Sequence, residues 1–293
     1  MDLIQVGERT YYIKNPTNIG IYKTDNDNVY LIDSGNDKDA GRRILKIIAE
    51  QGWTVKGIIN THSNADHIGG NKIICDRTGC DVLAFGIERS FTEHTVLESS
   101  FLYGGYPFKK LRNKFLMAKD TAVKSVEDNL PDGLEYFSLK GHFFDMIGIR
   151  TSDNVLFLAD SLFSEETIVK YHLFFIYDVK AYLETLDMLE KMEGTVFIPS
   201  HCEASESIDD LIELNRNKVN EIAELIFNIC KNPVTFEDVM KQIFDNYSLE
   251  MNTNQYVLIG STIRSYLSYL CDDERIEYYF DDNKMLWKQI KNN

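Results

Sequence analysis

Two histidines and an aspartate lie close together in the stretch THSNADHIGG, which runs from residue 61 to residue 70. The spacing of His62, Asp66 and His67 places all three side chains in one loop and the start of the helix that follows it. Neutral imidazoles and carboxylates that converge in this way are the usual protein ligands of zinc and iron. We therefore expect a metal-binding loop in this stretch.

Three further candidate ligands come later in the chain, each at or just after the end of an apolar, strand-like run. They are His142, Asp160 and His201. A single histidine after a strand is usually a hydrogen-bonded structural residue, but four of the six histidines of this chain occupy such positions. The joint pattern predicts that several loops contribute ligands to one metal site.

The motif His62-Ser63-Asn64-Ala65-Asp66-His67 resembles the His-x-His-x-Asp-His signature of the metallo-β-lactamase superfamily, over about residues 1 to 204. The resemblance implies an αβ/βα sandwich with the site at the upper edge of two sheets. It also implies one metal held by His62, Asn64 and His142, a second held by Asp66, His67 and His201, and Asp160 bridging the two. We expect one or two divalent ions, zinc first, with iron or manganese as alternatives.

Asn64 stands where the family pattern has its second histidine. An amide oxygen is a poorer zinc ligand than an imidazole nitrogen. We therefore expect an unequal pair, with a firm metal at the subsite of Asp66 and His67 and a weaker one at the subsite of Asn64. The alternative is a decayed site that no longer binds metal for catalysis, in which the remaining residues persist only because they contact one another and stabilise the fold.

These residues predict a hydrolase. A bound divalent metal lowers the pKa of water and polarises an ester or phosphoryl oxygen, so a metal-bound hydroxide attacks without a side-chain nucleophile. Asp66 is the candidate catalytic residue that orients this water, and the expected substrate is a small ester, thioester, lactone or phosphodiester. The competing hypothesis is a non-catalytic or regulatory protein that binds metal or ligand and contacts a protein partner.

Other kinds of chemistry lack their motifs. The sequence contains no Gly-x-Ser-x-Gly elbow, phosphate-binding loop or dinucleotide fingerprint, which speaks against serine hydrolysis, nucleotide hydrolysis and hydride transfer.

The elements that must position these residues alternate along the first 204 residues. Strand patterns cover residues 10–13, 19–23, 28–33, 57–61, 134–139, 146–151, 154–159 and 195–198, and helix patterns cover 37–50 and 179–192. Strands followed by helices in both halves predict two sheets with helices on their outer sides, an α+β fold. Asp33, at a strand end, either orients the histidine loop by hydrogen bonds or has a structural role only.

Residues 205–293 follow a different pattern. A long amphipathic helix begins near Ser207, Thr235 and Asp238 form a capping-box pattern before a second helix, and a third covers 256–270. Two extended pieces, 275–280 and 284–288, then predict a hairpin and a small winged-helix-like module. It carries 9 Lys and Arg against 16 Asp and Glu, so we expect a packing or protein-contact role and no nucleic acid partner.

Residues 90–128 form a long insertion that is rich in aromatic residues and carries a basic cluster at Lys109, Lys110, Arg112 and Lys114. Such insertions often serve as lids. We expect it to cover the site and attract an anionic substrate, while a homodimer interface explains its aromatic residues equally well.

Composition limits the class of protein. The formal charge of −15 argues against unassisted binding to nucleic acid or an anionic membrane, and no segment approaches a membrane span. We expect a cytoplasmic protein with five buried free cysteines, since no disulfide or zinc-ribbon spacing occurs. We further expect His94 at the surface, His172 in a core or rim role, and Cys202 as a packed thiol.

Overall fold

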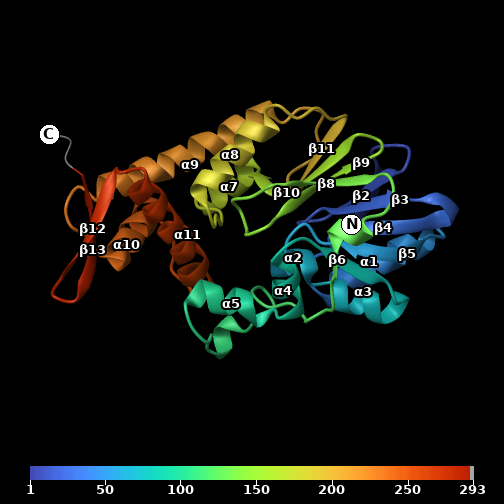
Figure 1. Ribbon diagram of the computed structural model, residues 1–293, viewed down its shortest axis with the longest axis horizontal. Helices are drawn as coiled ribbons and strands as arrows, with labels where there is room; N and C mark the ends of the chain where they lie inside the picture. Colours follow the sequence, from blue (N-terminus) through green and yellow to red (C-terminus); the bar gives the residue numbers. More distant parts are fainter. Residues whose placement is uncertain (291–293) are drawn as a thin grey trace.

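The computed structural model describes residues 1–290. Two β-sheets stack face to face, helices cover their outer sides, and a helical part that ends in a hairpin extends from one end of the sandwich (Figure 1). The α+β sandwich predicted from the sequence is therefore confirmed.

The first sheet has seven strands in chain order. They are β1 (Asp2–Gln5), β2 (Thr10–Lys14), β3 (Ile19–Lys23), β4 (Asn28–Ile32), β5 (Thr54–Ile59), β6 (Asp81–Ala84) and β7 (Lys124–Ser125). The first four pair antiparallel, and the pairs from β4 to β7 are parallel. The ends of β4 and β5 consequently meet at one edge, which is where the histidine loop begins. Strands β1, β6 and β7 are additions to the sequence prediction.

The second sheet has four strands in the spatial order β11-β10-β9-β8. They are β8 (Leu134–Ser138), β9 (Ile147–Thr151), β10 (Val155–Phe163) and β11 (Val196–His201). Strand β10 continues past the predicted end of its apolar run and is buried along its whole length. The two sheets enclose an apolar layer that includes Tyr22, Ile59, Ile149 and Phe157.

Helices form the outer layers of the sandwich. On the first sheet lie α1 (Lys38–Glu50) and α3 (Asn71–Thr78), and on the second lie α7 (Glu165–Tyr171), α8 (Val179–Leu189) and α9 (Asp209–Ile229). Helix α1 illustrates the cause: Ala40, Ile44 and Ile48 recur at helical spacing and are all buried. The Asp37 carboxylate caps its first turn by accepting hydrogen bonds from two backbone amides.

The carboxyl-terminal part contains α10 (Phe236–Asn246), α11 (Thr253–Asp272) and a hairpin of β12 (Ile276–Asp281) and β13 (Lys284–Gln289). The capping box of Thr235 and Asp238 is present as the sequence predicted. A single apolar core runs from β10 through α8 and α9 to α10 and α11, and includes Leu156, Ile222 and Ile263. The winged-helix likeness and a domain boundary at residue 204 stay predictions.

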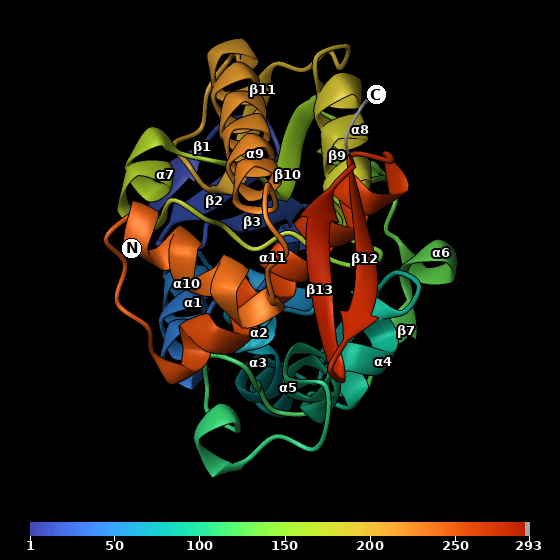
Figure 2. The same cartoon turned by 90° about the vertical axis from the view of Figure 1, so that its left-hand side faces the viewer.

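The insertion folds into short elements on the side of the molecule that faces α11 (Figure 2). They are α4 (Glu88–Glu93), α5 (Val96–Tyr103), the 3₁₀ turn η2 (Lys109–Leu111) and α6 (Val126–Asn129). A further 3₁₀ turn, η1 (Asp25–Asp27), connects β3 to β4. Leu102, Leu111 and Leu116 of the insertion pack on Val257 of α11. This contact within one chain accounts for part of the apolar content of the insertion.

The expectation that all five cysteine thiols are buried is wrong for four of them. Only Cys230 is buried, and the other four are half-buried, with the sulfurs of Cys75 and Cys80 3.9 Å apart. Among residues 1–290, no helix combines the length and the apolar composition that crossing a lipid bilayer requires.

The shared core predicts that the two parts of the chain unfold together. Ile222→Ala removes buried apolar atoms from α9 and should lower the free energy of unfolding by about 2–5 kcal/mol. Trp53 lies beside the first sheet and Trp287 lies in the hairpin. Tryptophan fluorescence during urea unfolding therefore follows the first sheet in a Trp287→Phe background and the hairpin in a Trp53→Phe background. Both reporters should shift to the same midpoint, and Asn217→Ala on the exposed side of α9 is the control. A shift confined to the hairpin reporter would show separate units.

Candidate metal centre

Five chain segments meet at one edge of the sandwich. The loop after β5 and the short helix α2 (Ala65–Ile68) carry the histidine motif, and the β8–β9 loop carries His142. Asp160 lies within β10, and His201 is the last residue of β11. The structure therefore brings together every side chain that the sequence nominated, and their roles as metal ligands stay a prediction.

Unusual backbone conformations position two of these segments and the end of β4, which lies behind the histidine loop. Asp33 and Ala159 have left-handed φ angles of 65° and 48°, which few residues other than glycine adopt. The pairing of β10 with β11 shifts register on both sides of Ala159, so the ladder beside Asp160 is irregular, as at a β-bulge. Gly141, before His142, has a φ of 118°, and a Cβ there would lie 2.3 Å from the backbone nitrogen of Tyr182. Such local strain is characteristic of functional sites.

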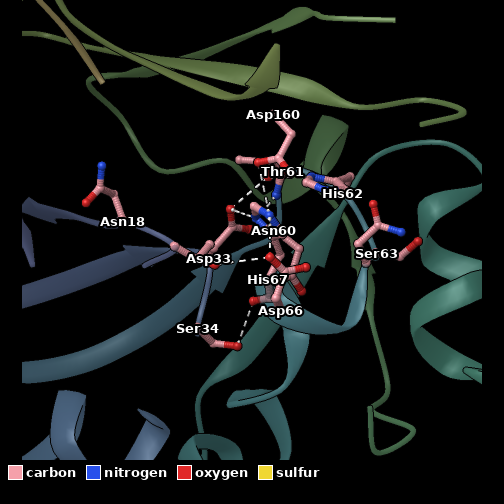
Figure 3. Close-up of polar contacts among 12 residues, drawn as sticks. Asn18, Asp33, Ser34, Asn60, Thr61, His62, Ser63, Asp66, His67 and Asp160 are labelled. Atoms are coloured by element: carbon pink, nitrogen blue, oxygen red, sulfur yellow. Dashed lines mark hydrogen bonds and ion pairs between the residues drawn. The ribbon is translucent and has the colours of Figure 1, made fainter. Parts of the chain in front are cut away.

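Asp33 anchors the histidine motif from behind (Figure 3). One carboxylate oxygen accepts a hydrogen bond from the Thr61 backbone amide at 2.8 Å. The other accepts from the Thr61 hydroxyl and from His67 Nδ1, each at 2.8 Å. Of the two roles expected for Asp33, orientation of the loop is the one that these contacts support.

The four imidazoles share one pattern of hydrogen bonds. In each ring Nδ1 is hydrogen-bonded to an oxygen outside the site. The partner is the Thr61 hydroxyl for His62, Asp33 for His67, the Phe175 carbonyl for His142 and the Pro16 carbonyl for His201. Because carbonyl and carboxylate oxygens only accept, Nδ1 carries the proton in the neutral ring, and Nε2 is left with a lone pair. The Thr61 hydroxyl donates to Asp33, so it also accepts from His62.

The Nε2 atoms and two carboxylates form two clusters that share Asp160. Asp66, His67, Asp160 and His201 make one, and His62, His142 and Asp160 make the other. His62 Nε2 is buried and has no hydrogen-bond partner among the described residues, and the buried His67 Nε2 and Asp160 Oδ1 lie 3.1 Å apart without hydrogen-bond geometry. Buried polar atoms without partners are costly, and a cation supplies the missing partner.

The distances in the first of these clusters fit a zinc ion, and we call it the tight subsite. Ligand atoms 2.0–2.1 Å from a tetrahedral zinc lie about 3.3 Å from one another. His67 Nε2 and His201 Nε2 each lie 3.1 Å from an oxygen of Asp160. Their distances to Asp66 Oδ2 are 3.6 Å and 3.4 Å. The donor set thus matches the expected ion in both chemistry and spacing.

The other cluster, with Asn64 added, is the weak subsite. Asn64 Oδ1 lies 3.1 Å from His142 Nε2, which in turn lies 3.6 Å from Asp160 Oδ2. Asn64 therefore points into the position where the resemblance implies a ligand.

Charge and burial shift the pKa values of these groups in opposite directions. Burial, with the nearby His67, holds the pKa of His62 well below its usual value. At His67 and His201 burial has the same tendency, but the facing Asp160 and Asp66 outweigh it and raise both pKa values well above the usual range. Burial also opposes ionisation of Asp160, yet the two imidazoles keep its pKa well below normal. Without a metal, protons on His67 and His201 balance the carboxylates.

The remaining histidines and Cys202 lie outside the clusters. His94 is exposed, as expected, and His172 stacks on Tyr247 with ring centroids 4.5 Å apart, which is a rim role. Cys202 is half-buried, its thiol donates to the Leu162 carbonyl, and burial raises its pKa to about 12. It behaves as the packed thiol that was expected.

Sequence reasoning missed three residues of the site. Thr17 donates a hydrogen bond to Asp66 Oδ2 at 3.1 Å, while Glu88 of α4 and Glu98 of the insertion contact Ser63 and Asn64, respectively. Both glutamates are buried. Buried carboxylates that contact a ligand loop are a structural signal, but their positions on short helices carry no periodic pattern in the sequence.

Residues 13–201 match the family model described as the metallo-beta-lactamase superfamily. Since this match spans more than half of the chain, the protein belongs to the metallo-beta-lactamase superfamily. The site lies at the sheet edge that the resemblance implied.

Solved structures agree on the fold along the whole chain. A beta-lactamase domain protein from Burkholderia ambifaria superposes with a TM-score of 0.75 at 15% identity and covers 99% of this chain and 94% of its own. A metallo-beta-lactamase family protein from Thermus thermophilus superposes with a TM-score of 0.71 at 16% identity, and the match covers 99% of this chain and 98% of that protein. Because the coverage includes α9 to α11, the carboxyl-terminal part belongs to this shared architecture.

Two curated relatives match short segments. Hydroxyacylglutathione hydrolase of Rhodospirillum rubrum is 35% identical over 65 residues, 20% of this chain and 25% of the relative. The protein of the same name from Erythrobacter litoralis is 46% identical over 48 residues, 16% of this chain and 19% of the relative. The matches span a quarter or less of these relatives.

Asp33 should control metal affinity without touching the metal. Asp33→Asn weakens the hydrogen bonds that orient His67 and Thr61, so we expect zinc affinity at the tight subsite to fall about 10-fold to 100-fold. Competition with a chromogenic zinc chelator measures this change, and Asp132→Asn on the surface is the control. Unchanged affinity would assign Asp33 a structural role alone.

Zinc binding should depend on pH through His67 and His201. Their raised pKa values mean that both hold protons at neutral pH in the metal-free protein, whereas zinc requires the neutral ring. Apparent affinity should therefore rise with pH through those raised pKa values, and binding should release protons. Calorimetry in two buffers with different ionisation enthalpies counts those protons. Affinity that is flat with pH, with no proton release, would contradict this assignment.

Proposed function

We propose that this protein is a metal-dependent hydrolase of a small substrate, with thioesters as first candidates and esters, lactones and phosphodiesters as further ones. One observation carries the proposal: four Nε2 atoms and the carboxylates of Asp66 and Asp160 converge beside an open cavity. The name of the two hydroxyacylglutathione hydrolases supports the thioester class.

A divalent ion bound here supplies Lewis acidity, which lowers the pKa of water and polarises the substrate oxygen. Asp66 is suited to orient the attacking water, because 41% of its side chain is exposed and Thr17 holds one of its oxygens. Asp160 is buried between His67 and His201, and its oxygens hold both Nε2 atoms at 3.1 Å. The hydrogen bonds behind the four rings hold every Nε2 in place before substrate binds.

The substrate pocket is a cavity of about 1010 Å³ that opens beside Asp66 and His142. Ligand pockets of 300–1,000 Å³ accept small organic molecules. Lys114 of the insertion and Lys170 of α7 line it, together with Asn252, Asn254 and Gln255 at the start of α11. These cations support an anionic substrate, and the insertion and α11 together form the wall that selects it.

The position of Lys114 favours the lid role for the insertion. Its ammonium pairs with Asp37 at 3.1 Å at the pocket rim, and Asn113 next to it bonds Asn254 of α11 at 3.2 Å. Tyr106 and Phe115 remain exposed, at 74% and 68%. A homodimer through these aromatic side chains stays a separate proposal.

Hydrolysis of a substrate panel tests the function. Zinc-, iron- and manganese-loaded protein should cleave at least one member of a set of neutral and anionic thioesters, esters, lactones and phosphodiesters. His201→Ala removes a ligand of the tight subsite and should lower kcat/KM by more than about a hundredfold. His94→Ala, at an exposed position away from the site, should retain the parental value.

Full metal occupancy without turnover of any substrate would contradict the proposal. That outcome would favour the competing class, a metal-binding or ligand-binding protein without catalysis.

A further inference from the structure

Two buried glutamates, one just before the insertion and one within it, contact consecutive residues of the histidine motif. Glu88, on α4, accepts hydrogen bonds from the backbone amide and hydroxyl of Ser63, and its second oxygen accepts from the Asp145 amide at 2.9 Å. Glu98, on α5, accepts from Asn64 Nδ2 at 2.8 Å. Within residues 1–290 neither glutamate forms an ion pair with Lys or Arg, although both are buried (relative exposure 0% and 5%). The two contacts differ, because only that of Glu98 reaches a candidate ligand side chain.

The Glu98 contact determines which end of the Asn64 amide faces the site. Burial raises the pKa of Glu98 well above its usual value, and a cation nearby favours the ionised form. The ionised carboxylate accepts only, so it binds the amide nitrogen and turns Oδ1 to the opposite side. Oδ1 lies there 3.1 Å from His142 Nε2. His142 Nδ1 donates its proton in a hydrogen bond to the Phe175 carbonyl oxygen, 2.9 Å away, which leaves a lone pair on Nε2.

With Glu98 ionised and the His142 ring neutral, the lone pairs of Asn64 Oδ1 and His142 Nε2 face each other at 3.1 Å with no hydrogen between them. This arrangement is repulsive by itself and becomes favourable when a cation lies beside both atoms. His62 Nε2, which is buried and has no partner among the described residues, belongs to the same cluster.

We propose that Glu98 is a positioning residue that makes Asn64 a metal ligand. Ligating histidines commonly donate their far N–H to a carboxylate, which fixes the ring and strengthens the donor atom. The Asn64 amide reproduces this arrangement, with oxygen toward the weak subsite and N–H toward Glu98. The pair Asn64–Glu98 thus replaces the imidazole that is absent from the motif, and the insertion completes the metal centre.

The inference rests on the proposed function only in requiring a divalent ion at the weak subsite. Zinc affinity tests it without any substrate. A protein that binds zinc at both subsites but hydrolyses nothing would contradict the proposed function and leave the role of Glu98 intact.

The experiment measures zinc affinity at both subsites by competition with chelators of graded strength. Glu98→Leu removes the acceptor and frees the amide, so affinity at the weak subsite should fall by about tenfold or more. Affinity at the tight subsite should stay within about twofold, as an internal control on folding. Glu98→Gln retains an acceptor oxygen, so its zinc affinity at the weak subsite should lie between those of the parental protein and of Glu98→Leu.

Reversing the polarity of the pair separates positioning from packing. In the double variant Asn64→Asp with Glu98→Gln, the introduced amide donates to the introduced carboxylate, whose other oxygen faces the metal. Affinity at the weak subsite should recover to at least the parental value. Asn64→Asp alone places two carboxylates together and should bind zinc less well than the double variant.

A structural role for Glu98 gives a different pattern. Glu98→Leu would then lower the melting temperature without changing affinity at the weak subsite, or the reversed pair would fail to restore it. Either result overturns the proposal.

Discussion

The position of one proton on each of four imidazoles determines what this site can bind. Oxygen atoms of Thr61, Asp33, Phe175 and Pro16 hold the Nδ1 protons outside the cluster, so in the neutral rings every Nε2 lone pair points inward. Two of these oxygens belong to backbone carbonyls. The geometry of the chain itself therefore fixes part of the donor set.

Holding such a cluster has an electrostatic cost that the fold must offset. Asp160 and three Nε2 atoms share a buried space, and burial disfavours every charged form in it. Raised pKa values at His67 and His201 and a lowered one at Asp160 indicate that protons compensate in the metal-free protein. A divalent cation held by these side chains would perform the same task, and its binding would then release protons.

Sequence reasoning succeeded where the signal was local. Residues at strand ends are brought together by any sheet edge, so the convergence of His142, Asp160 and His201 on the histidine motif could be predicted. The long amphipathic helix and the capping box of Thr235 were equally visible, because helical period and capping chemistry are local properties.

The missed features depend on contacts between distant residues. Glu98 reaches Asn64 across 34 positions, and Thr17 reaches Asp66 across 49. The shared core of α8 to α11 likewise depends on packing that no residue spacing encodes. An unexpected residue in a motif, such as Asn64, is the one signal that invited a search for a compensating partner.

The amide in place of an imidazole also gives the centre its expected asymmetry. Imidazoles and carboxylates alone make up the tight subsite, whereas the weak one depends on a neutral amide oxygen held by the insertion. Folding of the insertion onto α11 thereby connects the wall of the pocket to the metal centre.

Titration of the metal-free protein with zinc, followed by calorimetry and elemental analysis, tests the central claim most directly. The account predicts one tightly bound ion per chain and a second, weaker ion whose affinity increases in Asn64→His. Two equally tight ions, or a folded protein that binds none, would contradict it.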